Sequence, residues 1–199
     1  MHNSKIKSKR KNKMSLNIGG GSGDYKSFVK FDAKNNKWKT KKDGVEVEIQ
    51  NPVFVMDWSS LKTGWFLFLD GKAPSIAIDP SLESMAAQPS PEHKRGFDID
   101  VYSQANFGGV VNWTSTSAIV GKAIKELYTE YLSNPEGKAG KFPVVEATGA
   151  EPQKGKFGTN YKPILKVQKY VDKPEAFNAA GVTPIIPEPV VVKKAVNEF

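Results

Sequence analysis

The stretch Val45-Glu46-Val47-Glu48-Ile49 decides the fold class, because apolar and acidic side chains alternate along it residue by residue. A period of two places successive side chains on opposite faces of an extended chain and is typical of a half-buried β-strand. Phe28-Val29-Lys30-Phe31 shows a similar alternation. We therefore predict a mainly β protein.

Outward from these two segments, the same criteria predict further strands, most of them separated by Gly or Pro. They cover residues 53–58, 64–70, 96–102, 142–148 and 161–171.

One segment has the helical period instead. Ser115-Thr116-Ser117 supplies N-cap candidates, and Asn134-Pro135 stops the pattern after Leu132. Between them, apolar residues recur at spacings of three and four, as on an amphipathic helix. The face expected against the strands consists of Ile119, Ala123, Ile124, Leu127, Tyr128 and Tyr131.

The order of these elements favours an OB-like fold, a five-stranded Greek-key barrel with one α-helix between strands 3 and 4. Residues 53–70 count as two consecutive strands, and the segments at 28–31 and 45–49 then form an additional N-terminal hairpin. A small barrel or β-sandwich of another kind, with one helix, would give nearly the same pattern.

We divide the chain into three parts. Residues 1–24 form a flexible, basic and Gly-rich leader, because they contain too little apolar surface to fold alone. Residues 25–177 form the OB-like domain. Residues 178–199 form an extended tail, in which Pro184, Pro187 and Pro189 interrupt regular structure.

Length and composition are those of one soluble domain, with 199 residues of which 39% are hydrophobic. No apolar run approaches the roughly 20 residues that span a bilayer. The sequence after Met14 contains no hydrophobic signal-peptide core. Cysteine is absent, which excludes disulfides, thiol nucleophiles and thiolate zinc sites and fits a reducing cytoplasm.

The net charge of +8 favours an anionic partner, but it is unevenly distributed. Six basic residues and no acidic residue precede Met14, so the rest of the chain carries only +2. The leader is either an upstream extension or a basic arm that gathers phosphates through counterion release. Nucleic-acid binding must therefore be inferred from the body of the chain.

Catalytic residues are scarce, and we predict no enzyme activity, no cofactor and no metal. The histidines are His2 and His93, and neither has a nucleophile and acid at a recognisable spacing. Gly121-Lys122 lacks the other residues of a phosphate loop. Asp98 and Asp100 should share one strand face, where a metal-dependent nuclease would place ligands, but we favour a solvated face.

Aromatic and basic residues lie together on several expected strands and loops. Single-strand binding requires this combination, because rings stack on bases of any identity while Lys and Arg follow the phosphates. We predict that the following residues contact DNA: Trp38, Lys62, Trp65, Lys94, Arg95, Tyr102, Trp113, Lys156, Phe157, Tyr161, Lys162 and Lys169.

Strand alternation assigns directions to some of these rings. Phe54, Phe66 and Phe68 are expected in the core, so Trp65 should point to the opposite face and be exposed. Trp38 lies among lysines beside an Asn35-Asn36 turn, which indicates either a DNA-contacting loop or a solvated hairpin. Trp113 either contacts DNA or fastens the helix to the barrel.

The chain also resembles single-stranded DNA-binding proteins encoded by tailed bacteriophages. The similar stretches are Leu61-Lys62-Thr63-Gly64-Trp65, His93-Lys94-Arg95-Gly96-Phe97, Trp113-Thr114-Ser115, Pro143-Val144-Val145-Glu146, and Pro163-Ile164-Leu165-Lys166-Val167 running to Asp172-Lys173-Pro174. The resemblance implies an OB-like fold without enzyme activity that coats single strands. It also implies work beside phage or host replication and recombination proteins in the cytoplasm of an infected bacterium, with the oligomeric state open.

One departure from this class lies at the C-terminus. Many of its members end in an acidic tail that recruits replication partners, whereas this chain ends Lys193-Lys194-Ala195-Val196-Asn197-Glu198-Phe199. Two other interpretations stay open. A capsid- or tail-associated phage β-domain needs no exposed basic and aromatic groove, and an RNA-binding OB-like module would use the same stacking surfaces.

Overall fold

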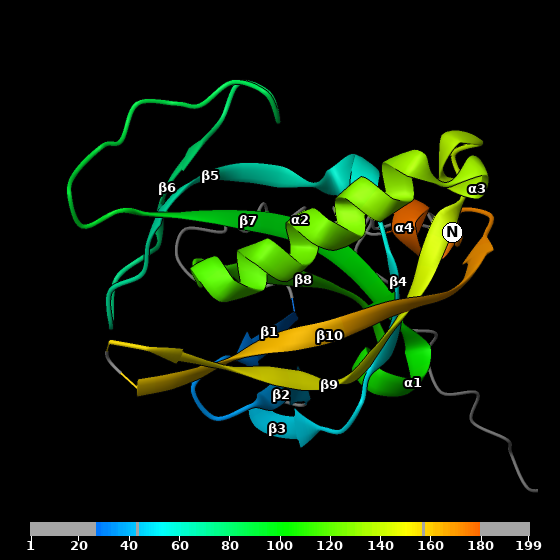
Figure 1. Ribbon diagram of the computed structural model, residues 1–199, viewed down its shortest axis with the longest axis horizontal. Helices are drawn as coiled ribbons and strands as arrows, with labels where there is room; N and C mark the ends of the chain where they lie inside the picture. Colours follow the sequence, from blue (N-terminus) through cyan, green and yellow to red (C-terminus); the bar gives the residue numbers. More distant parts are fainter. Residues whose placement is uncertain (1–26, 43, 157, 180–199) are drawn as a thin grey trace, which may run out of the picture.

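The protein is a mainly β structure whose sheet curls around one long helix (Figure 1). It is a computed structural model that describes residues 27–42, 44–156 and 158–179. The expected leader, residues 1–24, and all but the first two residues of the expected tail lie outside the described residues. The mainly β prediction is confirmed.

The sheet has ten strands. They are β1 (Phe28–Asp32), β2 (Lys37–Lys42), β3 (Val45–Ile49), β4 (Val53–Met56), β5 (Lys62–Leu67), β6 (Ser75–Ile78), β7 (Lys94–Ser103), β8 (Gly109–Ser115), β9 (Phe142–Gly155) and β10 (Gly158–Val171). The helices are the 3-10 turn η1 (Trp58–Ser60) and the α-helices α1 (Gln104–Phe107), α2 (Ala118–Ser133), α3 (Pro135–Lys138) and α4 (Ala176–Ala179).

Strand β7 organises the sheet. From Phe97 to Ser103 it pairs with β8 on one edge, while its other edge pairs with β5 near the start and with β4 near the end. Strands β4 and β5, interrupted by η1, therefore act as one broken strand beside β7. Strand β4 also pairs with β9, and β9 pairs with β10.

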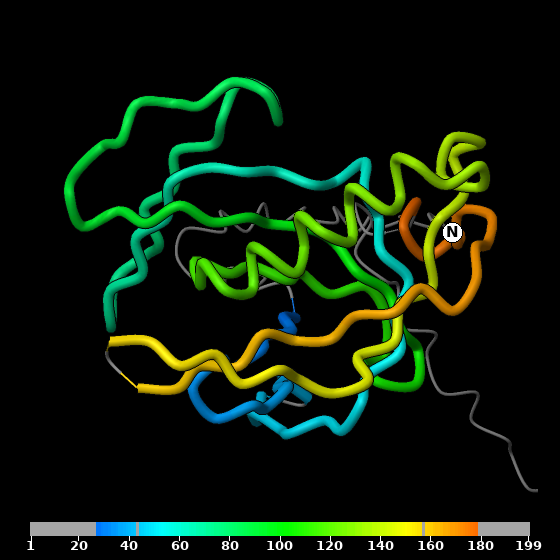
Figure 2. Tube along the Cα trace, in the orientation of Figure 1, coloured from blue at the N-terminus to red at the C-terminus, as the bar shows by residue number. Residues whose placement is uncertain are grey.

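The N-terminal strands extend the opposite edge. Strand β1 runs parallel to β8, and β2 and β3 follow as an antiparallel meander. The curl brings β1 back towards β10, where the Tyr161 amide donates a hydrogen bond of 2.7 Å to the Ala33 carbonyl (Figure 2). The sheet is thus an open half-barrel.

The core lies on the concave face and follows from alternation along the strands. Phe97, Ile99 and Val101 of β7 point inward, and α2 covers them with an apolar face. Trp113 of β8 is fully buried, 4.9 Å from the ring of Trp38 and 5.5 Å from that of Phe97, centroid to centroid. Close edge-to-face rings of this kind stabilise a core beyond their buried area.

Helix α2 agrees with its prediction. It begins after Ser117 and ends at Ser133, and it buries Ala123, Ile124 and Leu127 as expected. Val120, which the predicted face omitted, is also fully buried.

The strand count differs from the five barrel strands and the hairpin that were expected. β2, β6 and β8 were not predicted as strands. Phe68 was expected in the core, but it is 52% exposed because β5 ends at Leu67 and the chain leaves the sheet there.

Candidate nucleic-acid interface

Trp38 and Trp113, which were predicted to contact DNA, are buried, so their rings are not available to stack on a base. Trp38 is 6% exposed and Trp113 is 0% exposed. The lysine-rich segment around Trp38 is strand β2, in which Trp38 and Thr40 point into the core while lysines alternate outward. The alternation Lys-Trp-Lys-Thr-Lys was the available signal, because a period of two buries every second residue.

Two of the four lysines of β2 are matched by glutamates of β3. Lys37 lies 2.7 Å from Glu48, and Lys39 lies 3.0 Å from Glu46, which also contacts Lys30. Hydrogen bonds from Lys30 and Lys39 lower the pKa of Glu46. The charges of Lys30, Lys37 and Lys39 are therefore largely neutralised locally, whereas Lys41 and Lys42 at the end of β2 are exposed.

Trp65 points to the opposite face from Phe66, as predicted, but it is half-buried rather than fully exposed. Its ring lies 5.2 Å from the Arg95 guanidinium, and its indole nitrogen donates a 2.8 Å hydrogen bond to the Ala86 carbonyl. The predicted residues Trp65 and Arg95 are thus cross-strand partners in direct contact.

Asp79 holds this pair against the loop that follows β6. Its carboxylate accepts hydrogen bonds from both terminal nitrogens of Arg95, at 2.8 and 2.6 Å, and from the Ala86 amide at 2.9 Å. The hydrogen bonds from Arg95 are the main reason that the pKa of Asp79 lies far below its usual range. The carboxylate is buried, with its side chain 3% exposed, whereas the Arg95 side chain is 33% exposed. The surface therefore presents a cation.

Two facing glycines explain why Phe66 is buried on the other side of β5. Gly64 and Gly96 are cross-strand partners, and a Cβ on either would lie 2.5 Å from a backbone oxygen. The Phe66 ring occupies the space beside Gly96 and stacks on Phe68 with centroids 6.2 Å apart. Lys94 pairs with Phe66 in register and is exposed, as is Lys62. This face therefore offers one exposed ring, Phe68, near exposed lysines.

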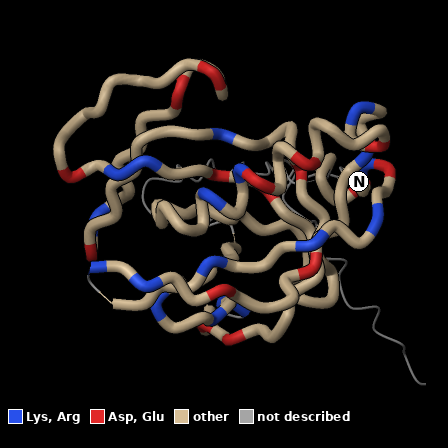
Figure 3. The backbone as a smooth tube through the Cα atoms, in the orientation of Figure 1, with Lys and Arg blue, Asp and Glu red and all other residues tan. Residues whose placement is uncertain are grey.

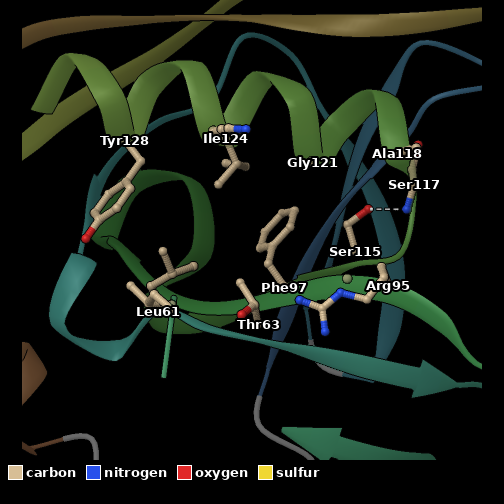
Figure 4. A pocket seen from close by; sticks show the side chains of 13 residues that line it. Leu61, Thr63, Arg95, Phe97, Ser115, Ser117, Ala118, Gly121, Ile124 and Tyr128 are labelled. Carbon is tan, nitrogen blue, oxygen red and sulfur yellow. Dashed lines mark hydrogen bonds between the residues drawn. The ribbon is translucent and has the colours of Figure 1, made fainter. Parts of the chain in front are cut away.

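The Trp65 side of β5 and β7 continues into a pocket beneath the first half of α2 (Figure 4). The pocket has a volume of about 510 Å³. The sheet contributes Leu61, Thr63, Arg95, Gly96, Phe97 and Ser115, and the helix side contributes Ser117, Ala118, Gly121, Ile124, Lys125 and Tyr128, with Leu82 from the loop. None of these residues is acidic.

Tyr102, Tyr161 and Lys162 lie elsewhere and do not join Trp65. Tyr102 is half-buried, with its ring centroid 6.1 Å from that of Phe177. Tyr161 packs partly against the core. Lys162 is 15% exposed and lies 2.8 Å from Glu126 and 3.6 Å from Glu151, so its charge is already paired.

The hairpin of β9 and β10 carries the remaining predicted cations. Its two strands pair from Phe142 and Val171 to Gly155 and Gly158, and basic positions are spaced along it (Figure 3). Lys154, Lys156, Lys166 and Lys169 are exposed. Phe157 lies outside the described residues.

Asp98 and Asp100 project from one face of β7, as predicted. The Asn112 amide donates to Asp98 at 2.9 Å and to Asp100 at 3.3 Å, and Thr114 also donates to Asp98. Across the described ranges, no three metal-ligating side chains gather in one place. The acids are thus linked to β8 by polar side chains.

His93 was expected as a simple loop residue, but it is buried. Its ring nitrogens lie 2.9 Å from the Ser90 hydroxyl and 3.0 Å from the Ser75 hydroxyl. It therefore fastens the segment before β7 to β6.

In the part of the chain that the structure describes, no helix is long and apolar enough to cross a bilayer.

The sequence reasoning missed two features of this region. Asp79 gave no local signal, because its partner Arg95 lies 16 residues away. Gly121 did give a signal, because a glycine inside a helix costs about 1 kcal/mol of stability relative to alanine and therefore indicates a packing or functional role. In the structure, a Cβ at Gly121 would meet nothing within 4 Å, so the residue leaves the pocket open.

Comparisons with known proteins give no match: no family model, no curated protein and no solved structure is similar to this chain.

Proposed function

We propose that this protein binds single-stranded DNA without sequence specificity, on an OB-like platform. The assignment takes β4 with β5 as the first barrel strand, β7 and β8 as the second and third, and β9 and β10 as the fourth and fifth. The order supports it, because α2 then lies between the third and fourth strands. The meander of β1, β2 and β3 is an addition to this platform.

Oligonucleotides bind OB-folds at the second and third strands and at the loops joining strands 1 and 2 and strands 4 and 5. In the assignment above, the first loop includes β6 and the second is the tip of the β9–β10 hairpin. Both hairpins reach the same side of the molecule, at the left of Figure 1. Lys94 lies where the first loop joins β7, and Lys154 lies near the tip of the β9–β10 hairpin. Both are exposed and can contact a phosphate backbone.

The observation that carries the proposal is the contact between Trp65 and Arg95. The Trp65 indole is half-exposed and lies against the Arg95 guanidinium, whose counterion Asp79 is buried. Arg95 also lines the pocket, and no carboxylate does. Single-strand binding uses such a pair, because the ring stacks on a base and the cation contacts phosphate. Lys154, Lys166 and Lys169 of the β9–β10 hairpin extend the contact surface. Phe68, Lys62 and Lys94 offer further contacts on the opposite face of β5 and β7.

Fluorescence titration tests the proposal directly, because burial simplifies the signal. Trp38, Trp58 and Trp113 are at most 7% exposed, so quenching by a bound base must come mainly from Trp65. We expect oligo-dT to quench the protein and to bind more tightly than duplex DNA, with an affinity that falls as salt rises. Equal affinity for duplex, or no binding at low salt, would contradict the proposal, and a preference for oligo-U would indicate an RNA-binding module.

A second candidate is a phage structural protein that assembles through an apolar surface. One observation favours it, namely that large apolar residues are exposed along β6 and its flanking loops, and contiguous surfaces of this kind mark interaction sites. These residues are Phe68, Leu69, Ile76, Ile78, Leu82 and Met85. Stable oligomers without oligo-dT binding would support this candidate over the first.

A further inference from the structure

The pocket beneath α2 has the shape and lining of a small aromatic-ligand site. Its volume of about 510 Å³ falls within the range of about 300–1,000 Å³ that ligand pockets occupy. The walls include the rings of Phe97 and Tyr128, which approach from the sheet and from the helix (Figure 4). Gly121 leaves the space beneath this part of the helix free of a side chain.

Polar groups gather on one side of this pocket. Ser115 and Ser117 contribute hydroxyl groups, whereas the Thr63 hydroxyl donates its proton to Asp79. The Ser115 oxygen accepts from the Ser117 amide at 3.2 Å, which leaves its own proton available to a ligand. Apolar walls with a few hydroxyl groups suit a nucleobase, which has two apolar faces and a polar edge.

The charges at the pocket suit an anionic chain attached to that base. Arg95 and Lys125 line it, and no carboxylate does. Asp79 compensates Arg95, but it lies beneath the guanidinium with its side chain 3% exposed, and it occupies one side of the planar fork. The remaining N–H groups of Arg95 are free to meet a phosphate oxygen, because a guanidinium has five donors.

We propose that this pocket receives one unstacked base of the bound single strand, with Phe97 and Tyr128 against its faces and Arg95 and Lys125 near its flanking phosphates. The inference rests on the single-strand binding proposed above. Trp65 then stacks on a neighbouring base outside the pocket, since Arg95 contacts Trp65 and also lines the pocket. The strand is gripped at two adjoining positions by chemistry that tolerates any sequence.

Gly121 provides the test, because a side chain added there enters open space. Gly121→Leu fills the pocket and Gly121→Ala fills it less, while both replacements favour the helix. Thr129→Leu is the matched control, because Thr129 is exposed on the same helix and does not line the pocket. Fluorescence anisotropy measures the affinity of each full-length variant for labelled oligo-dT at low salt.

We expect Gly121→Leu to weaken oligo-dT binding by about five- to a hundredfold, the range for losing one stacked base. Gly121→Ala should weaken it less, and Thr129→Leu should bind like the unaltered protein. Melting temperatures of both Gly121 variants should equal or exceed that of the unaltered protein. If Gly121→Leu binds as tightly as Thr129→Leu, the pocket proposal is overturned while the binding function stands.

Two further results separate the proposals. If the unaltered protein does not bind oligo-dT, the proposed function fails and the pocket proposal fails with it. Photo-crosslinking of the unaltered protein to oligo-dT containing 5-iodouracil needs no variant to fold. A crosslink to Phe97 or Tyr128 supports the pocket, and crosslinks confined to residues outside its lining overturn it.

Discussion

Trp65 combines two roles at one position, because its ring is half-exposed beside Arg95 while its nitrogen anchors the loop at Ala86. Trp65→Ala should weaken oligo-dT binding by about five- to a hundredfold. It should also cost about 1 kcal/mol of stability through the lost hydrogen bond. Trp65→Phe keeps a ring, so it should retain more of the affinity while losing most of the fluorescence quenching. Anisotropy and thermal melting measure both effects, and unchanged affinity in Trp65→Ala would remove Trp65 from the interface.

Asp79 has a buried carboxylate whose pKa is lowered by hydrogen bonds from Arg95. Asp79→Asn should destabilise the protein by about 2 kcal/mol at pH 7, because it breaks a charge-assisted contact. A lowered folded pKa contributes stability that is complete above the unfolded value of about 3.9 and is lost as pH falls further. The difference in the free energy of unfolding between the unaltered protein and Asp79→Asn should thus stay constant from pH 8 to 5 and shrink below about pH 4. Urea denaturation measures it, and Asp70→Asn, in an exposed turn, should show no such difference.

At the scale of elements, period and capping residues predicted β3, β7 and α2, because each has a regular pattern set by its own sequence. Strand β2 was missed because only Trp38 and Thr40 of its six residues are buried, and lysines dominate the rest. The direction of the Trp65 side chain was predicted from the alternation along the strand. The loop that covers it was not. That loop depends on Asp79 and Ala86, which reach Trp65 and Arg95 only after β6 has paired with β5.

Because β2 packs against the core, Trp38→Ala should lower the stability of the protein, whereas in a DNA-contacting loop it would lower the affinity for DNA. Trp38 contacts the rings of Phe31, Phe54 and Trp113, so Trp38→Ala should cost about 3–5 kcal/mol of stability through a core cavity. Lys41→Ala, on the exposed side of the same strand, should change stability by less than about 0.5 kcal/mol. Chemical denaturation followed by circular dichroism measures both. A stable Trp38→Ala variant with impaired binding would restore the loop interpretation.

The whole molecule distributes its charge in a way that composition alone conceals. Of the net charge of +8, only +2 belongs to the chain from Met14 onward. Within the described residues, several cations are further matched by acids at the surface: Lys30, Lys37, Lys39, Lys141 and Lys162 lie in ion pairs. Arg95 differs, because its partner Asp79 is buried. Any attraction for phosphate in the body must therefore come from local groups, of which the β9–β10 hairpin and the region around Trp65 are the best placed.

This distribution predicts how salt affects binding in two altered proteins. For single strands, a plot of log affinity against log salt concentration has a slope of about −0.7 per neutralised phosphate. A protein starting at Met14 lacks six basic residues, so it should bind more weakly and its slope should flatten by at most about 4. Replacing Lys154, Lys166 and Lys169 by Ala should flatten the slope by about 2, if each contacts one phosphate. Neither change should alter the melting temperature by more than a few degrees, because the three lysines are exposed and the leader sequence has too little apolar surface to pack as a core. Anisotropy of labelled oligo-dT across a salt series measures the slopes. If the protein starting at Met14 no longer binds, the leader alone supplies the attraction and the curled sheet is not the interface. If it binds duplex DNA as tightly as oligo-dT, the body of the chain has no preference for single strands.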